Sequence, residues 1–69
     1  MKISARNQIR GKIVDVKKGA TTSHIRIEVA SGLVITAAIT NEAVEELALK
    51  PGQPAIAVIK ASDVMIAID

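Results

Sequence analysis

The amino-acid sequence predicts a small all-β domain with one short helix. The chain has 69 residues, of which 11 are Ile, 7 are Val and 4 are Thr, and these branched side chains favour extended backbone. Apolar and polar residues alternate in several short runs, which is the period of a half-buried strand. Turn-forming Gly and Pro residues separate the runs. Because this length suffices for one hydrophobic core, we expect a single domain over residues 1–69.

Three strands are expected in the first half of the chain. The first runs from Gln8 to Lys17, and its apolar positions change parity after Ile13, which indicates a β-bulge or sharp coiling. The second strand alternates cleanly, and its apolar face consists of Ser23, Ile25, Ile27 and Val29. Ser31-Gly32 predicts a hairpin into a third strand, Leu33 to Ile39. Both faces of this third strand are apolar, as in a sheet that is covered on both sides.

One helix and two further strands complete the expected order. Thr40 or Asn41 can cap a helix whose early glutamates favour its N-terminal end, and Lys50-Pro51-Gly52 should end it. Residues Gln53 to Lys60 form the expected fourth strand, and residues Val64 to Ile68 the fifth. This order predicts a five-stranded OB-type Greek-key barrel with the helix between strands three and four, closing one end.

Composition and charge exclude several classes of protein. The chain has no Cys and one His, so disulfides are excluded and a structural zinc site is disfavoured. A domain this small then gains stability most readily by self-association. No apolar run approaches the roughly 20 residues needed to span a bilayer, so we expect no membrane partner. The absence of Cys fits a cytosolic protein.

The residues needed for catalysis are scarce. There is no Cys nucleophile, and the single His has no partner in the sequence that would make a triad. Glu45 and Glu46 are adjacent on the expected helix, so their carboxylates diverge. No phosphate-binding glycine loop is present. We therefore expect a protein that is not an enzyme and needs no cofactor.

Nucleic-acid binding is the alternative function, because small OB-type barrels commonly bind single strands. A phosphate-binding patch could be formed by Arg6, Arg10, Lys12, Arg26 and Lys60. However, such barrels stack bases on aromatic side chains, and the chain has no Phe, Tyr or Trp. Its net charge of +2 is also too balanced for an extended basic surface.

Two short polar segments near the chain ends are better suited to a small anion. In Ser4-Ala5-Arg6 a hydroxyl and a guanidinium occupy one face of an extended segment, and Lys60-Ala61-Ser62 repeats the pattern with an ammonium group. Together with free backbone N–H groups, such a set is rich in donors and suits an oxyanion. Spacing alone favours a solvated lead-in and a turn over a binding site.

The same segments resemble those of a known family. Residues 4–8, Gly11-Lys12-Ile13, residues 29–32, Lys50-Pro51-Gly52 and residues 60–64 are similar to the molbindin (Mop) family of small molybdate- and tungstate-binding domains. The resemblance covers essentially the whole chain. It implies an OB-type barrel assembled as a homohexamer, a trimer of dimers, which binds oxyanions between its subunits without transforming them. It further implies a cytoplasmic molybdate store or buffer that has no nucleic-acid partner.

The resemblance also implies two kinds of binding site, neither with a directly coordinated metal. The main oxyanion site would consist of Ser4, Arg6, Lys60 and Ser62, with the backbone N–H groups of Ala5 and Ala61. A second site, on the threefold axis of the hexamer, would be formed by Thr21, Thr22, Ser23 and His24. For His24, a surface imidazole without a ligand is an equally good interpretation.

Overall fold

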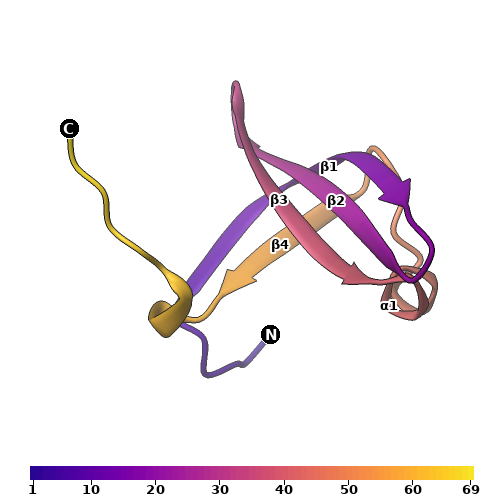
Figure 1. Cartoon of the computed structure of the whole chain (residues 1–69), viewed down its shortest axis with the longest axis horizontal. Coiled ribbons are helices and arrows are strands. Elements are labelled where there is room, and N and C mark those ends of the chain that lie inside the picture. The colour runs from indigo at the N-terminus through magenta and orange to yellow at the C-terminus, as the bar shows by residue number, and fades with distance from the viewer.

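The computed structural model describes all 69 residues and contains one antiparallel sheet of four strands (Figure 1). The elements are β1 (Asn7–Lys18), β2 (Thr22–Ala30), β3 (Leu33–Thr40), α1 (Asn41–Leu47), β4 (Pro54–Ile59) and the 3-10 turn η1 (Ala61–Asp63). The strand order is β3-β2-β1-β4, which leaves one edge of β3 and one edge of β4 unpaired. The predicted all-β class and the first four strands are confirmed.

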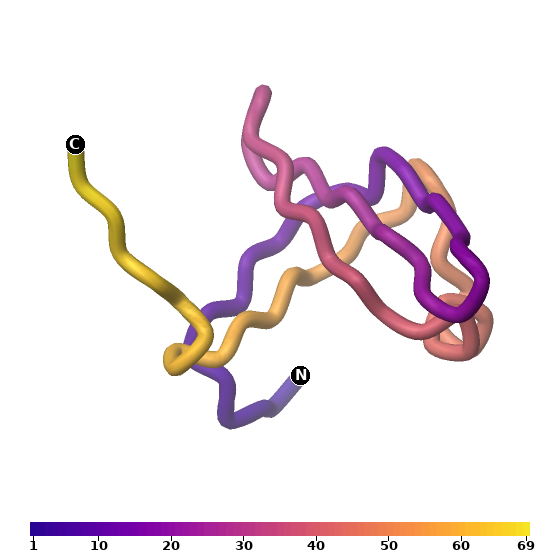
Figure 2. Tube along the Cα trace, viewed as in Figure 1, coloured from indigo at the N-terminus to yellow at the C-terminus, as the bar shows by residue number.

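A β-bulge in β1 explains how the sheet coils. The register between β1 and β2 shifts between Ile13 and Asp15, as the change of apolar parity predicted. Val14 occupies the bulge and is 43% exposed, whereas Val16 packs against the core. The bulge bends β1, so that its first half pairs with β4 and its second half only with β2. Figure 2 shows this long, curved path.

The core lies on the concave face of the sheet. Ile13 and Ile25 are each 1% exposed, and Ile27, Val44 and Ala57 complete the buried cluster. The inward face predicted for the second strand is confirmed, including Ser23, which is fully buried. Gly11 permits a close approach of β1 to β2, because a Cβ atom there would lie 2.5 Å from the carbonyl oxygen of Glu28.

The helix α1 closes one end of the sheet with Val44. Its N-cap is Thr40, whose hydroxyl accepts a hydrogen bond of 3.1 Å from the backbone N–H of Ala43, so one of the two predicted caps is confirmed. The predicted end at residues 50–52 is too late. Ala48 adopts a left-handed conformation with φ of 51°, and this turns the chain so that Leu49 packs against the core.

The fifth strand and the closed barrel are absent from the single chain. Residues Val64–Ile68 follow η1 as an extended tail that lies away from the sheet (Figures 1 and 2). The tail does not pair with any strand of the sheet, so the sheet stays open between β3 and β4. The cover expected over both faces of the third strand is also incomplete, and Leu33 is 57% exposed.

Candidate functional site

The two donor-rich segments lie at the same end of the sheet. β1 and β4 are antiparallel, and Asn7 is the register partner of Ile59. The side-chain amide of Asn7 also donates a hydrogen bond of 3.2 Å to the carbonyl of Ile59. Arg6 directly precedes this pair and Lys60 directly follows it. The fold therefore brings Ser4-Ala5-Arg6 and Lys60-Ala61-Ser62 together. In the sequence, 53 residues lie between Arg6 and Lys60.

Local contacts hold both segments in place. Ala5 is 8% exposed, and its carbonyl accepts a hydrogen bond of 3.1 Å from the side chain of Gln8. On the other segment, the backbone N–H of Asp63 donates to the carbonyl of Lys60 at 2.9 Å, which forms η1. Gln8 and Asp63 flank the donor segments and thus anchor the site backbone through the carbonyls of Ala5 and Lys60.

The donors themselves are free. The side chains of Ser4, Arg6, Lys60 and Ser62 make no hydrogen bond within the chain, and all four residues are exposed. Of the backbone hydrogen bonds outside the strands and helices, none is donated by Ala5, Arg6, Ala61 or Ser62. The one ion pair of the chain joins Lys18 to Glu45 at 3.8 Å. Arg6 and Lys60 thus carry charges that no carboxylate neutralises.

This arrangement can bind a small anion through hydrogen bonds and charge. An arginine offers a planar fork of N–H groups and a lysine a compact charge, so together they suit a tetrahedral oxyanion. No group of three His, Cys, Asp or Glu side chains lies close enough to hold a metal ion. The groups that this end of the sheet offers to a ligand are therefore N–H and O–H donors and two positive charges.

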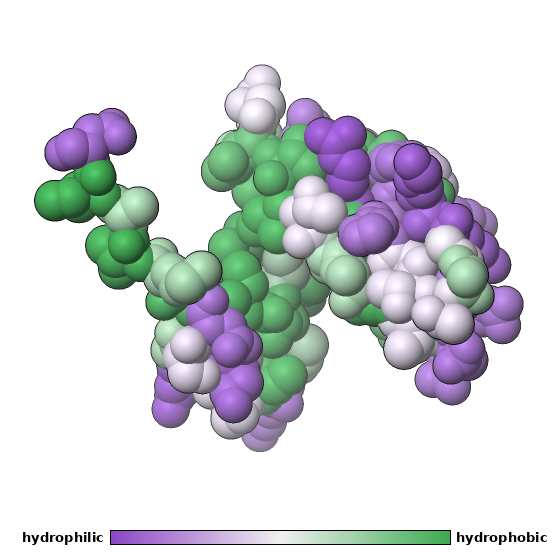
Figure 3. All heavy atoms as spheres, viewed as in Figure 1, coloured by the Kyte–Doolittle hydropathy of each residue, from purple (hydrophilic) through white to green (hydrophobic).

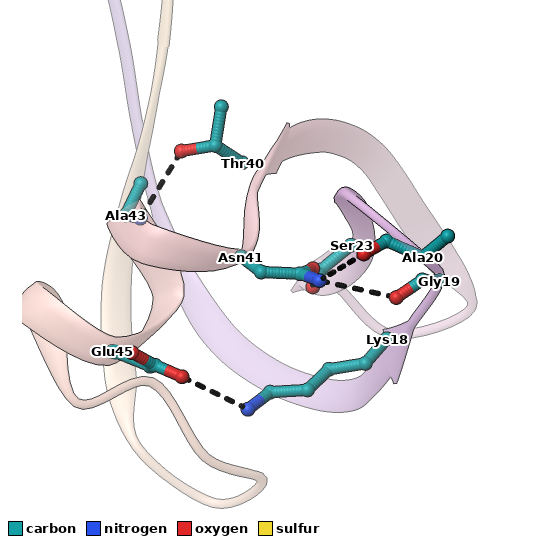
Figure 4. Close-up of polar contacts among 8 residues, drawn as sticks. All are labelled: Lys18, Gly19, Ala20, Ser23, Thr40, Asn41, Ala43 and Glu45. Carbon is teal, nitrogen blue, oxygen red and sulfur yellow. Dashed lines mark hydrogen bonds and ion pairs between the residues drawn. The ribbon is translucent and has the colours of Figure 1, made fainter.

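The residues suggested for a second site lie at the opposite end of β1. Ser23 is buried, and its hydroxyl donates to the side-chain oxygen of Asn41 at 2.5 Å. The amide nitrogen of Asn41 donates in turn to the carbonyls of Gly19 at 3.1 Å and Ala20 at 3.3 Å (Figure 4). Ser23 thus has a structural partner, whereas Thr21, Thr22 and His24 are exposed.

Asn41 is the residue whose role the sequence did not reveal. The sequence indicates for Asn41 only a possible role as the helix cap. The one hint of another role is that Thr40, the residue before it, can serve as the cap instead. The structure shows that Thr40 caps α1 while Asn41 ties the helix to the β1–β2 turn. Its backbone N–H also donates to the carbonyl of Thr21 at 3.0 Å.

We expect Asn41→Ala to lower the free energy of unfolding by about 1–3 kcal/mol, because the buried Ser23 hydroxyl and two turn carbonyls lose their partner. Thermal unfolding followed by circular dichroism measures the effect. Glu46→Ala is the matched control, since Glu46 is exposed on the same helix. Equal melting temperatures for the two variants would contradict the structural role of Asn41.

The cations on the outer face of β1 and β2 do not form a uniform basic surface. Lys12 lies opposite Glu28 in the strand register, and Arg26 lies opposite Asp15. Charges of opposite sign across adjacent strands attract each other and reduce the local potential. Together with the absence of aromatic residues, this alternation disfavours the nucleic-acid alternative.

Comparison with known proteins shows which family the chain belongs to. A family model described as the TOBE domain matches residues 3–66. Molybdenum-pterin-binding protein 1 of Clostridium pasteurianum is 52% identical over 66 residues, which cover 96% of this chain and 97% of that protein. A probable molybdenum-pterin-binding protein of Haemophilus influenzae is 41% identical over the full length of both chains. These relatives are named for binding and not for catalysis.

Solved structures show the same fold. MopII from Clostridium pasteurianum, in an apo form, superposes with a TM-score of 0.90 and 48% identity, covering 97% of this chain and 100% of that one. A molybdate-binding protein from Sporomusa ovata superposes with a TM-score of 0.92, 32% identity and coverage of 99% and 100%. The chain is therefore a TOBE domain over residues 3–66, and it belongs to the molbindin (Mop) family.

Proposed function

We propose that this protein binds molybdate, and tungstate in the same way, without transforming it. The observation that carries the proposal is the meeting of two donor segments at one end of the sheet, with two cations that no carboxylate pairs. The main site would consist of Ser4, Arg6, Lys60 and Ser62, with the backbone N–H groups of Ala5 and Ala61. The names of the relatives from Clostridium pasteurianum and Sporomusa ovata support molybdenum oxyanion as the ligand.

The donor set itself favours molybdate over phosphate. Molybdate near neutral pH is a dianion whose oxygens only accept hydrogen bonds. Phosphate at the same pH is partly protonated, and its O–H group would face N–H and O–H donors without an acceptor. Sulfate is also a bare dianion, so its rejection would depend on the size of the pocket. Tungstate nearly matches molybdate in shape and should bind comparably.

Self-association is part of the proposal. Arg6 and Lys60 are exposed in the single chain, so an anion bound there would remain largely in water, where each hydrogen bond contributes little. A second copy that covers this end would exclude water and strengthen both charge interactions. A homohexamer built as a trimer of dimers supplies such interfaces. In such an assembly a second kind of site would be formed by Thr21, Thr22, Ser23 and His24. Within each copy, the hydroxyl of Ser23 is also held by its hydrogen bond to Asn41.

The biological role that follows is storage or buffering of molybdate in the cytoplasm. The solved structure of the cytoplasmic molybdate-binding protein ModG superposes with a TM-score of 0.89 and 43% identity. This chain covers 46% of that one. No helix of this chain has the length and apolar character needed to span a membrane.

Titration calorimetry of molybdate into the purified protein tests the function, with sulfate and phosphate as matched anions. We expect heat and saturation with molybdate and tungstate, and neither with the two controls. A silent molybdate titration would refute the proposal. Equal binding of sulfate would reduce it to general anion binding.

A further inference from the structure

Two adjacent side-chain amides at the start of β1 each hold one of the two donor segments. The Nδ2 atom of Asn7 donates across the sheet to the carbonyl of Ile59 at 3.2 Å, directly before the second segment. The Nε2 atom of Gln8 donates back along the chain to the carbonyl of Ala5 at 3.1 Å, inside the first segment. Successive side chains of a strand point to opposite faces, so two neighbouring residues can serve two segments that lie in different directions.

The bond from Gln8 closes a bend over Arg6. It joins residues 5 and 8, and the backbone bends at residue 6 between them. Apart from this bond, residues 1–6 form no hydrogen bond within the chain. The other constraint on the bend is the packing of Ala5, which is 8% exposed. The direction in which the Arg6 guanidinium leaves the backbone therefore depends on the Gln8 amide.

The bond from Asn7 fixes the distance between the two segments. Asn7 and Ile59 are register partners where β1 begins and β4 ends, and the side-chain bond adds a further link at this end of the sheet. Figure 3 shows hydrophilic residues gathered at this end of the molecule beside a hydrophobic surface. The like charges of Arg6 and Lys60 repel each other when no anion lies between them, so their backbones need such a link to stay close.

We propose that Asn7 and Gln8 are positioning residues of the anion site and act through Lys60 and Arg6 without touching the anion. The inference rests on the proposed function and names two residues that set the affinity of its main site. A donor segment that is ordered before binding needs no further ordering when the anion arrives, and the affinity rises by that difference. Gln8 is exposed, so its hydrogen bond competes with water and adds little to the stability of the fold. Its effect is therefore on binding.

Titration calorimetry of molybdate into Gln8→Met tests this role. Methionine keeps the length of the side chain and removes the donor. We expect an affinity roughly three- to tenfold below that of the native protein, the factor by which one solvent-exposed hydrogen bond shifts a local equilibrium, and an unchanged melting temperature. Val14→Met is the matched control, because Val14 is an exposed position of the same strand, and it should bind as the native protein does. Native affinity in Gln8→Met would overturn the proposal.

Double-mutant cycles distinguish positioning from a general weakening of the site. If Gln8 acts through Arg6, Gln8→Met should have little further effect in the Arg6→Ala background. Asn7→Leu, which keeps the approximate shape of asparagine without its donor, should weaken binding in the native background and have little further effect in Lys60→Ala. Equal losses in both backgrounds would overturn the proposal, because they show that the amides act on the fold or on the anion itself.

A measurement without any anion keeps the test independent of the proposed function. A native protein that fails to bind molybdate refutes that function alone. Nuclear magnetic relaxation of the backbone nitrogens in the unliganded protein then reports the order of each N–H group. We expect Gln8→Met to increase the mobility of the Arg6 N–H, and Val14→Met to leave it unchanged. An equally ordered Arg6 N–H in the native protein and in Gln8→Met would overturn the proposal.

Discussion

Replacing Arg6 with alanine is expected to lower the affinity for molybdate by about one to two orders of magnitude, which corresponds to one or two hydrogen bonds to a charged group. Arg6 is one of two unpaired cations at the meeting point of β1 and β4. Its loss leaves a dianion facing a single positive charge. The assembly should persist, because Arg6 lies outside the strands and the core. Titration calorimetry gives the affinity and sedimentation gives the mass.

Two further variants separate the fork of Arg6 from its charge. Arg6→Lys keeps the charge and loses the paired N–H groups, so its affinity should lie between those of the native protein and Arg6→Ala. Arg10→Ala removes an equal charge four residues away, where the register partner is Ile56 and not a site residue. Arg10→Ala should bind molybdate nearly as well as the native protein. Unchanged affinity in Arg6→Ala would exclude Arg6 from the site.

Ile13→Ala should destabilise the fold by about 2–5 kcal/mol, the range for truncating a fully buried aliphatic side chain. Ile13 is 1% exposed and belongs to the central cluster with Ile25 and Val44. Its backbone also bonds to Gln53 and Gly52, at 2.9 and 2.8 Å, which ties β1 to the loop before β4. Those bonds do not depend on the side chain, so the loss would report packing.

The next residue in the chain provides the control for Ile13. Val14 is 43% exposed at the bulge, so Val14→Ala should cost less than about 1 kcal/mol, as at most surface positions. Both variants are compared in denaturant at one protein concentration, because association would add to the apparent stability. Equal midpoints would show that the bulge does not separate a buried from an exposed position.

The bulge illustrates what local pattern predicts well. Ile13 and Val14 reveal a parity change because strand side chains alternate with a period of two, and any break in that period requires an extra residue. The cap at Thr40 and the hairpin at Ser31-Gly32 are also predicted from local sequence. Each depends on conformational preferences of adjacent residues, and Gly32 does adopt the positive φ of 78° that such a turn uses.

The features that the sequence did not reveal depend on residues far apart in the chain. The Lys50-Pro51-Gly52 signal predicts the end of the helix too late, because the helix ends at Leu47 and the left-handed Ala48 turns the chain so that Leu49 packs against the core. The hydrogen bond from the Ser23 hydroxyl to Asn41, eighteen positions away, is likewise not indicated by any local pattern, and the place of Ser23 in a second binding site stays a prediction. The conformational preferences of neighbouring residues predict neither the end of the helix nor the bond between Ser23 and Asn41, since both follow from how distant elements pack.

The amino-acid sequence by itself determined the strand pattern, the inward faces and the pool of donors at Ser4, Arg6, Lys60 and Ser62. Only the tertiary structure decided that these donors meet, because their meeting follows from the antiparallel pairing of Asn7 with Ile59. It also decided that Val64–Ile68 is not a strand of its own sheet. Alternation is a property of a segment, whereas a strand exists only when a partner supplies the hydrogen bonds.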